Sequence, residues 1–398
     1  MFRRVYLDNS ATTPVDPRVL EAMMPFFTEK YGNASSIHYF GQETRAAVDK
    51  ARHQIAALIN ARPNEIVFTS GGTEANNLAI RGMIENLRSR GEFAGKRLHI
   101  VTTAIEHPAV MSVCENLEDE GISMTVVPVQ ENGIVSVADI ETAINDETVL
   151  VSVMTANNEI GTIQPVIDIG KLIKSMRDQG RKIWFHTDAV QAVGKIEVDV
   201  NEIGCDILSM SAHKIYAPKG IGALYVRRGT RLRTQNIGGR QERGIRGGTE
   251  SVPLIAGFGT AAELAGETLA KESDRLGILR NDLESRIFES IDGAVLNGDA
   301  ENRLPNITNI SFSGIEGEAL LINLDMNGIA VSTGSACSSG SLEPSPVIRA
   351  LGRDDGLARG AIRFSFGRMN ESDDVARIVD VLPECVAKLR EISRSVSR

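Results

Sequence analysis

Cysteine is scarce in this chain, with four residues among 398. Cys114, Cys205, Cys337 and Cys385 lie far apart, and no two of them form a Cys-x-x-Cys pair. This spacing argues against a zinc site and against a framework of disulfide bonds. A reducing compartment is the simplest interpretation, so we expect a cytoplasmic protein.

An excess of positive charge is also missing. The formal net charge is −9 at pH 7, so few cations are left to neutralise the phosphates of a nucleic acid or an acidic membrane surface. The segment at 236–251 is rich in Gly and Arg, but no aromatic residues interleave with the arginines, and we interpret it as an ordered loop. No apolar run reaches the roughly 18 residues that a membrane-spanning helix needs. We therefore expect direct binding to neither nucleic acid nor membrane.

What the sequence does contain is an alternation of helical and strand-like patterns. Hydrophobic residues make up 42% of the chain, which is ordinary for a globular protein with a large core. The strand-like segments are apolar on both faces, as in a parallel sheet covered by helices. They lie at 64–70, 97–107, 123–129, 148–158, 182–190, 205–214 and 222–228. The alternation predicts an α/β fold with a mostly parallel central sheet.

The pattern changes in the last third of the chain. Two long helical patterns, at 254–270 and 273–291, precede a strand at 306–312, a helix at 316–328 and a strand at 361–367. Near the N-terminus, residues 17–32 read as one amphipathic helix. We predict a large domain over 16–262 and a smaller α+β domain made of 1–15 and 263–398.

Lys214 carries the strongest indication of chemistry. It follows a buried strand in "SMSAHKIYAPKG", next to His213. A lone lysine in such a turn is usually solvated, but partial burial and nearby positive charge would lower its pKa and suit a Schiff-base lysine. We interpret Lys214 as the residue that holds pyridoxal 5′-phosphate, because other parts of such a site are present.

Asp188 lies at the end of the strand in "KIWFHTDAVQ", where open α/β sheets place ligand-binding groups. A carboxylate there can keep a pyridine nitrogen protonated. Gln191, three residues further on, could donate to the ring oxygen O3′. The alternative is that Asp188 is a helix N-cap.

The segment "FTSGGTEANN" runs from a strand through two glycines into a helix. The backbone N–H groups of Gly72 and Thr73, the Thr73 hydroxyl and the helix dipole could bind one phosphate. This is not a P-loop, because the Gly-Lys-Ser/Thr ending is missing. Ser211 and His213 could add donors, and an ordinary capped helix is the alternative.

Two further polar residues end strands. His107, in "TTAIEHPAV", could stack on the cofactor ring and shuttle a proton; the alternative is a structural histidine. Asn158, in "MTANNEIG", could touch the ring oxygen or the substrate.

Cys337 and Arg363 are candidates for a reactive thiol and for substrate binding. Cys337 lies in "STGSACSSGSLEPS", whose composition predicts a mobile, exposed loop. An exposed free cysteine suggests a reactive thiol, and an unreactive loop cysteine is the alternative. The other three cysteines are interpreted as structural. Arg363 lies on an apolar strand, where a bidentate grip on an α-carboxylate would explain a buried cation. A structural salt bridge is the alternative.

Taken together, these segments resemble the cysteine desulfurases of the NifS/IscS type, within the fold-type I pyridoxal-phosphate enzymes. The resemblance runs almost end to end, from "VYLDNSATTPVDP" to "IRFSFGR", and its one small departure is Ala217, where glycine is common. It implies that Lys214 binds the cofactor covalently, that His107 stacks on its ring and that Cys337 carries a persulfide. The other cofactor contacts that it implies fall on Gly72, Thr73, Asn158, Asp188, Gln191, Ser211 and His213.

The resemblance also implies a reaction and partners. L-cysteine would yield L-alanine and a persulfide on Cys337, for donation to an iron–sulfur scaffold or another sulfur acceptor such as a tRNA-thiolation protein. It implies a homodimer in which Thr249 reaches the phosphate of the partner subunit's cofactor. No resident metal is expected, although the persulfide of Cys337 could transiently ligate an iron–sulfur cluster. A selenocysteine lyase, another class V enzyme and a non-catalytic sulfur carrier are the alternatives.

Overall fold

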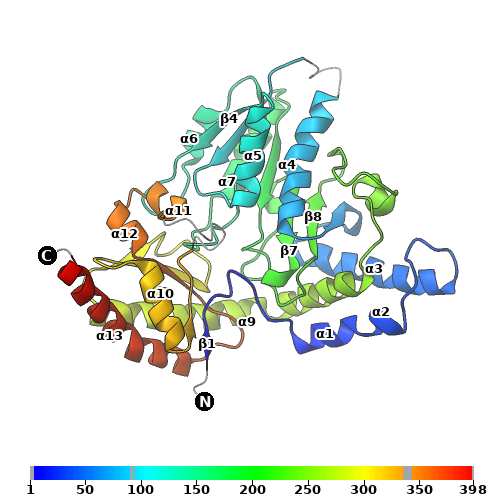
Figure 1. Cartoon of the computed structure of the whole chain (residues 1–398). Coiled ribbons are helices and arrows are strands. Elements are labelled where there is room, and N and C mark those ends of the chain that lie inside the picture. The colour runs from blue at the N-terminus through cyan, green and yellow to red at the C-terminus, as the bar shows by residue number, and fades with distance from the viewer. Residues whose placement is uncertain (1–3, 90–92, 94, 335–342, 397–398) are drawn as a thin grey trace.

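The computed structural model describes residues 4–89, 93, 95–334 and 343–396. Its centre is a seven-stranded sheet with the strand order β2-β8-β7-β6-β5-β3-β4 (Figure 1). Only β8 runs antiparallel to its neighbours, so the predicted mostly parallel α/β sheet is confirmed. The strands are β2 (Ile66–Thr69), β3 (His99–Thr103), β4 (Ser123–Val127), β5 (Thr148–Ser152), β6 (Trp184–Asp188), β7 (Ile207–Ser211) and β8 (Gly222–Val226).

Helices cover both faces of this sheet, and its inner strands are buried except at Trp184, the first residue of β6. Successive residues of a strand enter different cores, as the alternation of a strand requires. Ile207 packs in one apolar cluster and Leu208 in the other. Helix α3 (Tyr39–Leu58) precedes the first of these strands. The helices that follow them are α4 (Gly72–Arg88), α5 (Pro108–Asp119), α6 (Val137–Ala143), α7 (Val166–Asp178) and α8 (Val200–Ile203).

A second core lies around a three-stranded antiparallel sheet of the order β12-β10-β9. The short N-terminal strand β1 (Val5–Tyr6) pairs in parallel with β11 (Ile329–Ala330), so the start of the chain lies beside its last third. The proposed domain limits, 16–262 and 1–15 with 263–398, stay a prediction. The elements here are β9 (Ala294–Asn297), β10 (Ile307–Phe312), β12 (Ala361–Ser365), α10 (Gly317–Met326), α11 (Pro346–Ala350), α12 (Asp355–Arg359) and α13 (Ser372–Val396).

Two helix predictions were wrong. The two patterns expected at 254–270 and 273–291 form one continuous helix, α9 (Val252–Ser290), which runs along the base of both parts of the molecule (Figure 1). Its apolar residues change core along its length: Ala261 and Ala262 pack in the large core, Leu283 and Ile287 in the small one. The apolar face of α9 therefore changes direction where the helix passes from one core to the other. This change interrupts the helical periodicity of the sequence, so the pattern predicts two helices.

The second correction concerns residues 17–32. The expected single helix is two, α1 (Pro17–Met23) and α2 (Pro25–Thr28). Pro25 separates them because proline has no N–H to donate and its ring crowds the preceding turn.

Within the part of the chain that the structure describes, no helix is both long and apolar enough to cross a membrane.

Candidate active site

Ten of the twelve predicted site residues line one cavity of about 400 Å³. The cavity lies at the carboxyl ends of the parallel strands, where open α/β sheets bind their ligands. The predicted residues in its wall are Gly72, Thr73, His107, Asn158, Asp188, Gln191, Ser211, His213, Lys214 and Arg363. Other residues in the wall that matter below are Ser10, Ala11, Asn76, Val190 and Gly334.

Asp188, the last residue of β6, has a carboxylate that is fixed on both oxygens. Asn76 of α4 donates from Nδ2 to Oδ2 at 2.7 Å, and the Val190 N–H donates to Oδ1 at 2.9 Å. The residue is only 6% exposed. Asn76 was missed by the sequence prediction, although it belongs to the predicted segment "GGTEANN". These two bonds hold a charged, hydrogen-bond-accepting group at the cavity wall.

The amine of Lys214 is held by the N-terminal segment. Lys214 ends a short 3₁₀ turn directly after β7, and its Nζ donates to the backbone oxygens of Ser10 at 2.5 Å and Ala11 at 2.8 Å. Sequence reasoning missed both acceptors, because backbone carbonyls have no residue signature. The contacts place a lysine amine inside the cavity.

His107 both caps a helix and lines the cavity, so the structural and the functional interpretation of the sequence both apply. It is the N-cap of α5, and its Nδ1 accepts from the Ala109 N–H at 3.0 Å. Burial lowers the pKa of His107, the Lys214 amine lowers it further, and Asp188 acts in the opposite direction. A neutral ring whose Nδ1 accepts a hydrogen bond carries its proton on Nε2. The structural role and a place in the cavity wall therefore coexist.

Part of the cavity wall suits an anion. Gly72 and Thr73 begin the 17-residue helix α4, whose first N–H groups have no intrahelical partner. A side chain at Gly72 would place its Cβ 3.0 Å from Val190 Cγ2, a tight contact that the Val190 side chain would have to relieve. Burial lowers the pKa of His213 to about 4, with Lys214 adding to the effect, so that a neutral ring faces the site. These groups have the hydrogen-bond donors of a phosphate-binding site.

Arg363 on β12 is 3% exposed and already has two partners. One guanidinium nitrogen pairs with Asp8 Oδ1 at 2.7 Å, and another donates to the Asn158 carbonyl at 2.8 Å. The salt bridge that the sequence left open as an alternative is therefore present. Arg363 nevertheless lines the cavity, so the bridge and substrate binding are compatible.

Three residues of the cavity wall each carry a buried polar atom that lacks a hydrogen-bond partner in the described part of the chain. Among the described residues, no hydrogen bond reaches Ser10 Oγ, Asn76 Oδ1 or Arg363 Nε. All three residues line this cavity. A buried polar group without a partner is costly, and a bound ligand that supplies the missing bonds removes that cost. With an amine, a fixed carboxylate and an anion cradle, the donor set fits pyridoxal 5′-phosphate.

The other two predicted site residues are Cys337 and Thr249. Cys337 lies outside the described residues. Two described residues that flank this segment, Gly334 and Ser345, both lie against buried Glu159. Ser345 Oγ donates to Glu159 Oε2 at 2.6 Å, and a Cβ at Gly334 would come within 2.5 Å of the same oxygen.

Thr249 lines a separate cavity of about 160 Å³ with Ser70 and Arg246. Its predicted contact with a partner subunit's cofactor stays a prediction. The other three cysteines are buried and make no disulfide within the described ranges. No cluster of His, Cys, Asp or Glu that could hold a metal ion occurs among those residues.

The fold and the cavity are those of an α/β enzyme with a buried polar site, and comparisons with known proteins give the family. The model of the family "Aminotransferase class-V" matches residues 5–378. The chain therefore belongs to the class V aminotransferases, whose cofactor is pyridoxal 5′-phosphate.

The predicted resemblance to cysteine desulfurases is confirmed. The chain is 49% identical to the cysteine desulfurase IscS of Clostridium botulinum over 395 residues, covering 99% of this chain and 97% of the relative. It is 46% identical to the human cysteine desulfurase over 396 residues, covering 99% and 84%. The solved structure of a NifS-like protein superimposes with a TM-score of 0.89 at 38% identity, covering 97% of this chain and 100% of that one.

Proposed function

We propose that this chain is a pyridoxal-phosphate-dependent cysteine desulfurase, which converts L-cysteine to L-alanine and keeps the sulfur as a persulfide on Cys337. The observation that carries the proposal is one cavity in which the Lys214 amine, the Asp188 carboxylate and the first turn of α4 converge. Relatives that share almost the whole chain bear the name cysteine desulfurase.

The cofactor would be held at its two ends. Lys214 would bind it covalently, Asp188 would face the pyridine nitrogen, and Gly72 and Thr73, with Ser211, would hold the phosphate. When bound, the cofactor supplies an electron sink for the amino acid's Cα carbanion. His107 would cover one face of the ring with its neutral imidazole.

Arg363 would hold the α-carboxylate of L-cysteine. Its Nε is buried and lacks a hydrogen-bond partner in the described structure, and its other nitrogens are fixed by Asp8 and the Asn158 carbonyl. The Nε–H is one of the N–H groups that these two bonds leave unused, and a carboxylate is a natural partner for it. Asn158 would lie beside both cofactor and substrate, as the sequence predicts.

Lys214 would move the proton at Cα. Once released from the cofactor, the Lys214 amine can lose a proton to solvent. The neutral amine can then act as a base. The carbonyls of Ser10 and Ala11 hold Nζ at the cavity wall. Acceptors at this position would keep the amine at the cavity wall, where the substrate would bind.

Cys337 would receive the sulfur. Its thiolate attacks the substrate sulfur, an S–S bond forms, and the bond from that sulfur to Cβ breaks. The electron pair and a proton remain on the carbon product, which leaves as L-alanine, while the enzyme holds the persulfide. L-cysteine and one enzyme thiol thus give L-alanine and one persulfide, with atoms and electrons balanced.

The remaining partners belong to the same proposal. The enzyme would be a cytoplasmic homodimer in which Thr249 serves the partner subunit's cofactor. The sulfur would pass to an iron–sulfur scaffold or to a tRNA-thiolation protein. The acidic net charge of −9 is consistent with protein acceptors rather than direct contact with nucleic acid.

The test is to incubate the purified protein with L-cysteine and a thiol reductant and to measure L-alanine and sulfide. We expect equal amounts of the two products and loss of sulfide in Cys337→Ser. Alanine formation from L-selenocysteine alone would contradict the proposal and favour a selenocysteine lyase. No product from either amino acid would favour a non-catalytic sulfur carrier.

A further inference from the structure

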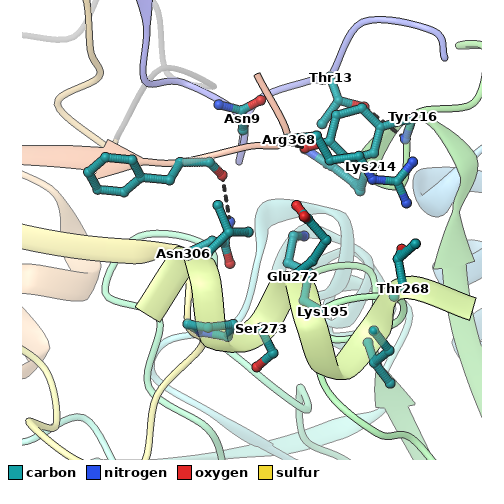
Figure 2. A pocket seen from close by; sticks show the side chains of 15 residues that line it. Asn9, Thr13, Lys195, Lys214, Tyr216, Thr268, Glu272, Ser273, Asn306 and Arg368 are labelled. Atoms are coloured by element: carbon teal, nitrogen blue, oxygen red, sulfur yellow. Dashed lines mark hydrogen bonds between the residues drawn. The ribbon is translucent and has the colours of Figure 1, made fainter. Parts of the chain in front are cut away.

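A second, smaller cavity of about 30 Å³ lies behind the candidate active site, and Lys214 lines both. Figure 2 shows it between helix α9, which contributes Thr268, Glu272 and Ser273, and the N-terminal segment, which contributes Asn9 and Thr13. A cavity of this size has room for about one water molecule. Its wall also contains Lys195, which has no role in the proposed reaction.

Lys195 is directed by a tight turn. It follows Gly194, which has a φ of +76°, and a Cβ at Gly194 would lie 2.7 Å from Ile215 Cγ2. Only glycine permits this backbone conformation and this approach without strain. Ile215 directly follows Lys214, so the turn that carries Lys195 packs against the segment that carries the cofactor-binding lysine.

The Lys195 amine contacts one residue twice. Its Nζ donates to the backbone oxygen of Gln191 at 3.0 Å and to the side-chain Oε1 of Gln191 at 3.1 Å. Burial lowers the pKa of Lys195 to about 7, and the nearby charges of Lys214 and Arg363 add to this effect. An amine donates hydrogen bonds in both its charged and neutral forms, so the contact to Gln191 persists across neutral pH.

These contacts determine which of its two possible orientations the Gln191 carboxamide adopts. Its Oε1 accepts from Lys195, and its Nε2 donates to the Ser10 carbonyl at 3.0 Å. In the flipped orientation two donors would face each other at Lys195, and two acceptors would face each other at Ser10. Both ends of the carboxamide thus select one orientation.

That orientation gives the cavity a hydrogen-bond donor. Nε2 carries two N–H bonds, of which one is used by Ser10, and Gln191 lines the cavity. The second N–H requires an acceptor such as a ring oxygen of the ligand. The same Ser10 carbonyl accepts from Lys214 Nζ. Lys195, Gln191, Ser10 and Lys214 therefore form one connected chain of hydrogen bonds.

We propose that Lys195 is a positioning residue, which holds Gln191 so that its Nε2 donates to the ring oxygen of the cofactor. This inference rests on the proposed function, because it needs pyridoxal 5′-phosphate in the large cavity. Lys195 itself touches neither cofactor nor substrate. It acts from the small cavity through the carboxamide of Gln191.

A double-mutant cycle tests this role with cofactor binding as the readout. The full-length wild type, Lys195→Met, Gln191→Ala and the double variant are stripped of cofactor and titrated with pyridoxal 5′-phosphate. The apparent Kd and the visible absorption spectrum are recorded. Lys174→Met, at an exposed position on α7, is the control. Folding is checked by thermal unfolding, and Lys195→Gln replaces the Met variant if the latter does not fold.

We expect Lys195→Met and Gln191→Ala each to raise the Kd by about tenfold, as the loss of one hydrogen bond to a charged oxygen implies. Both should change the visible spectrum in the same direction. The double variant should match Gln191→Ala, because Lys195 has no effect once its target is absent. The Lys174 control should equal the wild type.

Additive losses in the double variant would show that Lys195 acts independently of Gln191 and would overturn the inference. An unchanged Kd and spectrum in a folded Lys195→Met protein would do the same. Failure of the wild type to bind the cofactor would instead refute the proposed function. The two failures are therefore distinguishable.

Discussion

The carboxylate of Asp188 and the carboxamide of Asn76 are joined by a hydrogen bond of 2.7 Å across 112 residues of sequence. The bond connects the end of the central strand β6 to the first turns of α4, the helix that begins at the proposed phosphate site. A charge at a defined point of the cavity wall is thus held by the element that would bind the other end of the cofactor.

Asp188→Asn should lower kcat by about 10²- to 10³-fold, because a neutral amide cannot keep a pyridine nitrogen protonated. The cofactor should still bind covalently, since Lys214 is intact. Single-turnover alanine formation and the visible spectrum measure the two properties. Asp168→Asn, on the exposed side of α7, is the control. A kcat near the wild-type value would remove Asp188 from its role.

Arg363→Ala should raise the KM for L-cysteine by about 10- to 100-fold, the loss expected for a charged hydrogen bond to the carboxylate. Steady-state alanine formation measures it, with exposed Arg359→Ala as the matched control. Because Asp8 occupies one guanidinium nitrogen, Asp8→Asn should leave KM unchanged or lower it. An unchanged KM in Arg363→Ala would mean that another group holds the carboxylate.

Cys337→Ser should still bind L-cysteine at the cofactor, seen as a change in the visible spectrum, but should release no sulfide. A hydroxyl at this position is too weak a nucleophile to take up the sulfur. Cys385→Ser, which alters a buried thiol on α13, should keep sulfide release. Normal sulfide output from the Cys337 variant would exclude this residue as the acceptor.

Glu106 should make the protein less stable as the pH rises. Burial raises the pKa of this carboxyl from 4.5 to about 8 in the folded state. Between these values the folded protein keeps a proton that the unfolded chain loses, so stability falls with increasing pH and levels off above about 8. Glu106→Gln should remove this slope, worth at most about 3 kcal/mol near neutral pH.

Thermal unfolding of wild type and Glu106→Gln at pH 5 and pH 8 measures that slope. The Gln side chain keeps an oxygen for the Thr103 hydroxyl and the Met154 N–H, which Glu106 Oε1 accepts at 2.8 Å each. Glu118→Gln, at an exposed position on α5, should keep the wild-type slope. Equal slopes in all three proteins would show that Glu106 is ionised in the fold.

The cavity wall could be predicted largely because it is local in sequence. Asp188, His107 and Asn158 each follow a strand with an apolar pattern, and parallel strands bring such positions to one edge of the sheet. The partners that hold them could not be predicted in the same way. Ser10 contacts Lys214 across 204 residues through a backbone carbonyl, which no residue type encodes.

The fold, too, was predictable where the pattern is local and not where it depends on packing between distant segments. Strand positions followed from two-sided apolar segments, whereas α9 was read as two helices because its apolar face turns from one core to the other. Sequence periodicity assumes a single core per helix. A helix shared by two cores violates that assumption, and only the packed structure shows its continuity.

The most direct test of the proposed enzyme is the Lys214→Ala variant, studied beside Lys219→Ala, an exposed lysine five residues away. The measurement is the visible absorption of covalently bound cofactor, together with L-alanine formed from L-cysteine. The account predicts that Lys214→Ala loses both and that Lys219→Ala keeps both. Alanine formation by Lys214→Ala at the wild-type rate would contradict it.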